Sequence, residues 1–71
     1  IKEFLPASEA ESLILKQLSP EPRHIDEVCR LSGLTTPEVS STLAMLELKG
    51  VAKQMGSMYY ALAGEIKTGK L

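Results

Sequence analysis

The sequence is poor in the residue types that build catalytic and metal sites. Its 71 residues include one cysteine, one histidine and no tryptophan. A lone cysteine excludes an intramolecular disulfide, and zinc needs three or four protein ligands, so His24 and Cys29 cannot form a zinc site. We expect Cys29 in the core and His24 at a helix start. The isolated glycines form no phosphate-binding loop. With no catalytic constellation, we predict no enzyme, no metal and no cofactor.

An excess of positive charge and long apolar runs are also missing. The chain has eight Lys and Arg residues and nine Asp and Glu residues, which gives a net charge of −1. Dedicated DNA-binding domains gain much of their affinity by neutralising phosphates, so this balance argues against strong autonomous DNA binding. No apolar run approaches the length of about 18 residues that a membrane helix needs, and no signal-peptide layout is visible. We therefore expect a cytoplasmic location.

Length and composition are typical of one small domain. Hydrophobic residues make up 44% of the chain and charged residues 24%. A chain of this size buries only about 60% of its unfolded surface, which allows one modest core. Because the sequence lacks an initiating Met, we expect a piece of a longer protein. Within it we predict a linker or leader at residues 1–7, a folded domain at 8–63 and a flexible tail at 64–71.

The first predicted helix runs from about Ser8 to Leu18. Ser8 and Glu11 have the spacing of a capping box, and apolar residues follow at helical spacing. Pro20 and Pro22 end this segment because each removes a hydrogen-bond donor and fixes the backbone.

Two further helices are predicted in a helix-turn-helix arrangement. One spans residues 25–32 and ends before Gly33, a typical residue after a helix. The next begins at a capping box formed by Thr35 and Glu38 and runs to about Lys49. The connection between them is only a few residues long and contains a glycine, as in helix-turn-helix motifs.

A β-hairpin is predicted after the third helix. Runs at 51–55 and 58–62 flank a Gly-Ser pair at 56–57. Adjacent strand residues face opposite sides, so we expect Tyr60 in the core and Tyr59 exposed. The predicted fold class is mainly α with a small β-hairpin, a three-helix winged helix-turn-helix.

The third helix is the one that enters a DNA major groove in such folds. At about 100° per residue, Val39, Leu43 and Leu46 share the side expected to be buried. The opposite side has no Arg, Asn or Gln, the usual base readers. Contacts with DNA would therefore be weak and directed to phosphates, with one possible stacking tyrosine. The candidate DNA-binding residues are Thr36, Ser40, Ser41, Lys49, Lys53 and Tyr59.

The same outward side also supports a second hypothesis, a protein contact. Ala44, Met45 and Leu48 offer apolar surface, which suits a protein partner better than a phosphate. The sequence alone does not decide between the DNA contact and the protein contact.

Several segments resemble the C-terminal winged-helix domain of the DNA-processing protein family DprA, also called Smf. They are residues 14–18 and 20–27, residues 31–34 followed by 37–39, and, most specifically, 43–51 with Gly56 and 58–60. The likeness covers roughly residues 8–63.

The resemblance implies a bacterial cytoplasmic protein that acts in natural transformation. In that family a Rossmann-like core, absent here, binds incoming single-stranded DNA and helps to load the recombinase RecA. The implied partners are DNA, bound weakly through the third helix and the wing, the Rossmann-like domain of the parent chain, and RecA or a second copy. No membrane partner is expected. The predicted role is an auxiliary, non-sequence-specific DNA-binding module, with a protein-interaction or dimer-support module as the alternative.

Overall fold

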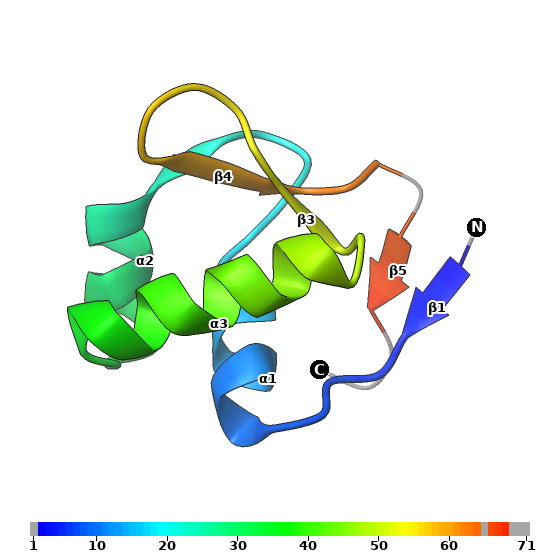
Figure 1. Cartoon of the computed structure of the whole chain (residues 1–71), viewed down its shortest axis with the longest axis horizontal. Helices are drawn as coiled ribbons and strands as arrows, with labels where there is room; N and C mark the ends of the chain where they lie inside the picture. The colour runs from blue at the N-terminus through cyan, green and yellow to red at the C-terminus, as the bar shows by residue number, and fades with distance from the viewer. Residues whose placement is uncertain (1, 65, 69–71) are drawn as a thin grey trace.

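Three helices surround an apolar core in the part of the chain that the computed structural model describes, residues 2–64 and 66–68. Helix α1 spans Glu9–Leu15, α2 spans Ile25–Ser32 and α3 spans Thr36–Leu48. Figure 1 shows α3 across the front, with α1 below it, α2 at one end and strands β3 and β4 above. The predicted winged helix-turn-helix is confirmed.

Helix α1 ends earlier than the sequence predicted. Ser8 caps it as expected, since its side chain accepts a hydrogen bond from the Glu11 N–H. The predicted end at Leu18 was wrong. The Gln17 N–H donates to the Ile14 carbonyl and the Leu18 N–H to the Leu15 carbonyl. These bonds reach back three residues, so the chain tightens and leaves the α-helix.

Helices α2 and α3 follow their predicted signals. The Gly33 N–H donates to the Cys29 carbonyl at 3.0 Å, and Gly33 has a φ of +76°, which ends α2 in the left-handed region that glycine favours. Thr35 and Glu38 form a reciprocal capping box at the start of α3. The short turn between these helices is therefore determined by local chemistry.

The wing is a three-stranded antiparallel sheet. Strands β2 (Arg23–His24), β4 (Tyr59–Leu62) and β3 (Ala52–Gln54) lie in the order β2–β4–β3. The sequence predicted only two strands. The two residues of β2 are too few for a periodic signal, and they become a strand only by pairing with β4.

The wing turn is longer than the predicted Gly-Ser pair. The Met55 N–H donates to the Tyr59 carbonyl, and both Gly56 and Met58 have positive φ values. Met58 therefore belongs to the turn, and β4 begins one residue later than predicted. The predicted orientation of the tyrosines is confirmed, because Tyr60 packs against the core and Tyr59 is 44% exposed.

The two ends of the chain pair with each other. Strand β1 (Lys2–Phe4) lies parallel to β5 (Ile66–Thr68), with Lys2 opposite Ile66. The sequence predicted a linker or leader at residues 1–7 and a flexible tail at 64–71; these two strands lie within those segments, and their pairing depends on a contact between distant parts of the chain. Residues 1, 65 and 69–71 of those predicted segments lie outside the described residues. The predicted boundaries at 8 and 63 stay a prediction.

The core joins all three helices to the base of the wing. Its fully buried members include Ile14, Val28 and Leu43, one from each helix. The other buried apolar residues are Leu15, Leu18, Ile25, Val39, Leu46, Val51, Ala52 and Ala61. Over the described residues, no helix has the length and apolar character needed to cross a membrane.

Candidate interaction surface on the third helix

Helix α3 presents an uncharged strip on the side opposite the core. Val39, Leu43 and Leu46 are completely buried, as the sequence predicted. On the outward side, Leu48 is 84% exposed and Met45 is 47% exposed. The other residues of this strip, Ser41 and Ala44, are small and also exposed, and Ser40 is exposed on the flank of the helix.

Lys49, a predicted phosphate contact, is turned away from this strip. Its Nζ donates to Glu11 Oε2 of α1 at 2.7 Å and lies 5.6 Å from the centre of the Phe4 ring. This ion pair joins the ends of α1 and α3 across 38 residues of sequence. The Lys49 charge is therefore already balanced within the domain.

Glu11 is the partner that holds Lys49. Its side chain is buried, at 5% residue exposure, and its Oε1 accepts the Ala7 N–H at 2.8 Å. Burial by itself would raise the pKa of Glu11. The hydrogen bonds from Lys49 and Ala7, together with the Lys49 charge, outweigh burial and hold that pKa below its ordinary value. The carboxylate thus stays ionised and fixes Lys49 at neutral pH.

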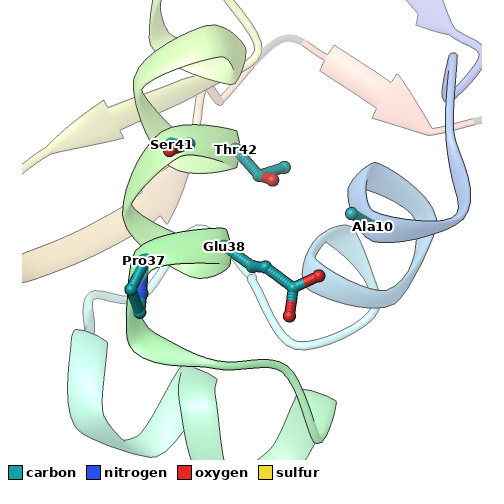
Figure 2. Close-up of a pocket in the computed structure, with 5 residues that line it drawn as sticks. All are labelled: Ala10, Pro37, Glu38, Ser41 and Thr42. Carbon is teal, nitrogen blue, oxygen red and sulfur yellow. The ribbon is translucent and has the colours of Figure 1, made fainter.

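A shallow groove of about 340 Å³ runs between α3 and α1. It is lined by Ala10, Pro37, Glu38, Ser41 and Thr42. Figure 2 shows the Glu38 carboxylate and the Thr42 side chain projecting from α3 toward α1, where Ala10 lies. Glu38 Oε1 accepts the N–H and the hydroxyl of Thr35, so the carboxylate is oriented by the capping box.

The outer face of the wing carries a second group of candidate residues. Lys53 pairs with Ala61, two residues beyond Tyr59, so Lys53 and Tyr59 are diagonal neighbours on one face of the sheet. The Tyr59 ring meets the His24 ring edge-on, with 5.0 Å between ring centroids. Lys53 and Tyr59 are both exposed.

His24 joins the wing to α2. It is the N-cap of α2, and its Nδ1 accepts the Asp26 N–H at 3.0 Å. The sequence indicated a helix start at His24 but not its capping bond, because histidine is not among the usual capping residues. Within the described residues, no three His, Cys, Asp or Glu side chains are grouped as a metal site would require.

A family model described as the DprA winged helix domain matches residues 5–57. The chain belongs to the DprA winged helix domain family. The match includes α1, α2, α3 and the groove between α1 and α3, and it confirms the resemblance stated from the sequence. No curated protein matches the chain in a sequence search.

In this DprA winged helix domain, the six predicted DNA contacts separate into different places. Ser41 lies on the outward strip of α3 and Ser40 on its flank, and both are exposed. Thr36 lies on the flank toward α2, where its Oγ1 is 3.9 Å from Cys29 Sγ. The other three are Lys49, held by α1, and Lys53 and Tyr59, on the wing.

The three predicted protein-contact residues stay together. Ala44, Met45 and Leu48 are all exposed on the outward side of α3. The geometry therefore gives the DprA winged helix domain one uncharged helical strip and one small aromatic and basic patch on its wing.

Proposed function

We propose that this domain is a docking module, which contacts a protein surface through the outward strip of α3. The observation that carries the proposal is the 84% exposure of Leu48 on an uncharged strip whose nearest cation, Lys49, is paired with Glu11. A phosphate-binding helix would present free cations here instead.

The physical chemistry of the strip favours a protein partner. Burying a Leu or Met side chain that was exposed to water stabilises a contact by about 1.5–3 kcal/mol. No charge on the strip would have to lose its hydration, so little of that gain is cancelled. The small side chains at Ser41 and Ala44 let another backbone approach closely.

Family membership supports a particular context for this docking. We place the domain as an accessory part of a DprA-like DNA-processing protein that acts in natural transformation and recombinase loading. The first partner to test is the Rossmann-like domain of such a parent chain, and RecA is the next.

A weak, non-sequence-specific contact with DNA is the second candidate function. It is favoured by the wing, where exposed Lys53 can pair with a phosphate and exposed Tyr59 can stack on an unpaired base. Ser40 and Ser41 could add phosphate hydrogen bonds. Glu47, exposed near the end of α3, would repel phosphates and weaken such a contact.

A residue-by-residue NMR titration tests both functions. The labelled chain is titrated separately with the Rossmann-like domain and with short duplex or single-stranded DNA at about 50 and 200 mM salt. Docking predicts that the signals of Met45 and Leu48 shift with the protein and not with DNA. Salt-dependent shifts of α3 with DNA alone would contradict docking and favour the second candidate.

Substitution of Met45 and Leu48 by Ser should abolish the shifts caused by the protein. The matched control is Leu31→Ser, because Leu31 is an exposed leucine on α2, outside the strip. If the control weakens docking as much as the double variant does, α3 is not the contact surface.

A further inference from the structure

A buried ion pair lies where the outward strip of α3 ends. Glu11 is the one buried charged side chain among the residues that the structure describes, and its Oε2 accepts a hydrogen bond from Lys49 Nζ at 2.7 Å. Replacing both members of such a pair by apolar side chains of similar size often leaves a fold equally stable or makes it more stable. Stability alone therefore does not explain why a charge is buried here.

Lys49 is the cation through which α3 would contact a nucleic acid. Helix α3 itself, Thr36–Leu48, contains no Lys or Arg, and Lys49 follows directly as its C-cap, next to the 84% exposed Leu48. A lysine ammonium is carried on a flexible four-carbon chain and has three donors. Without Glu11, Lys49 would give the end of α3 the free positive charge that phosphate binding requires.

The two partners differ in their access to water. The Lys49 side chain is 33% exposed, whereas the Glu11 side chain is 6% exposed. Glu11 therefore holds the ammonium from the side of the core, and water already reaches part of the lysine. Loss of the Glu11 charge would be enough to free the cation, with no movement of α3.

The segment before α1 helps to hold this pair in place. The Ala7 N–H donates to Glu11 Oε1 at 2.8 Å, while Oε2 of the same carboxylate accepts Lys49. The Phe4 ring packs against the core and lies 5.6 Å from Lys49 Nζ, within the range of a cation–π contact. Both partners of the ion pair thus have a second contact that orients them.

We propose that Glu11 excludes nucleic acid from α3 by occupying Lys49 in place of a phosphate. Carboxylate and phosphate oxygens accept the same charge-assisted hydrogen bonds from a lysine, so the two groups compete for it. A phosphate that took Lys49 would leave the buried Glu11 charge without its partner, which is costly. The inference rests on the proposed docking function, and it names the residue that makes α3 select a protein over a nucleic acid. Glu11 acts through Lys49 and is therefore a positioning residue.

Glu11→Gln tests the proposal as a gain of DNA binding. The glutamine side chain keeps an acceptor for the Ala7 N–H but has no charge to hold Lys49. The matched control is Glu9→Gln, which removes the same charge from an exposed position of the same helix. Each 71-residue chain is titrated with a short duplex at about 50 and 200 mM salt.

The expected gain has a defined size and salt dependence. At the lower salt concentration, Glu11→Gln should bind the duplex about threefold or more tightly than Glu9→Gln does. One additional phosphate contact increases the slope of log affinity against log salt by about 0.9. The advantage of Glu11→Gln should therefore fall by about 3.5-fold between the two salt concentrations.

A second substitution shows whether Lys49 causes the gain. Lys49→Gln, combined with Glu11→Gln, removes the freed cation and restores the net charge of −1. This double variant should bind the duplex no more tightly than the wild type does. Thermal unfolding followed by circular dichroism checks that each variant keeps its fold.

The wild-type chain provides a test that needs no variant. NMR signals of the methylene group next to Nζ report on each lysine separately. When the duplex is added at about 50 mM salt, the Lys49 signals should stay unchanged, whatever the exposed Lys53 does. In Glu11→Gln, the Lys49 signals should shift.

Three results would overturn the proposal: a Glu11→Gln chain that binds no more tightly than Glu9→Gln, a gain that persists without Lys49, or Lys49 signals that shift in the wild type. Docking is measured separately, through the response of Met45 and Leu48 to the Rossmann-like domain. A gain of DNA binding without that response would support the role of Glu11 and contradict docking. Docking without the gain would do the reverse.

Discussion

The two helices of the helix-turn-helix bury similar apolar stripes but present different surfaces to solvent. Helix α2 buries Ile25 and Val28 and exposes Asp26, Glu27 and Arg30, of which Arg30 and Glu27 form an ion pair at 3.3 Å. Helix α3 also buries its apolar stripe completely, yet the residues along the middle of its outward side are uncharged.

The difference between the exteriors of α2 and α3 distinguishes what the core requires from what it does not require. The charged exterior of α2 shows that burying an apolar stripe in this core does not require an apolar exterior. The apolar residues on the outward side of α3 therefore add nothing that the core needs. They are the residues on which the proposed docking contact depends.

The largest expected effect distinguishes the two sides of α3. Leu46→Ala should lower the free energy of unfolding by about 2–5 kcal/mol, because it opens a cavity at a fully buried position. Leu48 lies two residues further along α3, and Leu48→Ala should change the free energy of unfolding by less than about 0.5 kcal/mol. Urea unfolding measures both. Similar losses for the two variants would mean that the outward strip belongs to the core.

Removing the buried carboxylate of Glu11 should have the next largest effect on stability. Glu11→Ala should cost about 1–3 kcal/mol, because Lys49 loses its partner and the Ala7 N–H loses its acceptor. Lys49 is 33% exposed, so water can partly compensate and the loss stays below that of a fully buried charge. The comparison variant is Glu9→Ala on the same helix, an exposed residue for which urea unfolding should detect almost no change.

The same residue sets part of the pH dependence of stability. The folded-state pKa of Glu11 lies below its ordinary value near 4.5, so the unfolded chain takes up the proton first as the pH falls. The stabilisation is complete above that ordinary value and is lost as the pH drops through the folded-state pKa. Glu11→Gln should remove this component, which pH-dependent urea unfolding would reveal as a flatter acid limb. An unchanged acid limb would contradict it.

A smaller effect compares the caps of the two helices. Thr35→Ala should cost about 1 kcal/mol, because it removes the side-chain acceptor that receives the Glu38 N–H. At α2, His24→Asn keeps a side-chain acceptor at the N-cap and should change stability less than His24→Ala. Thermal unfolding of the three variants checks the order, and a stable Thr35→Ala chain would show that the core alone holds α3.

The smallest expected effect on stability belongs to the outward strip. Substituting Met45 and Leu48 together by Ser should change the free energy of unfolding by less than about 0.5 kcal/mol, since both are surface positions. The same double variant should lose docking. Unfolding of this variant would show that the two residues are core, and the contrast between α2 and α3 would disappear.

Much of the fold and part of the candidate surface could be predicted from local signals. The bounds of α2, the capping box of α3 and the buried stripe of Val39, Leu43 and Leu46 depend on residues three or four positions apart. The exposure of Met45 and Leu48 follows from the same helical geometry. These features need no knowledge of distant segments, which is why sequence alone was sufficient.

What the sequence by itself determined is therefore the helix-turn-helix, the apolar strip on α3 and the membership of the DprA winged helix domain family. The tertiary structure alone decided three other features. Strand β2 forms by pairing with β4, β1 forms by pairing with β5, and Lys49 is held in an ion pair by Glu11, 38 residues away. Each feature depends on contacts between segments far apart in the chain, and the pattern of neighbouring residues does not indicate such contacts.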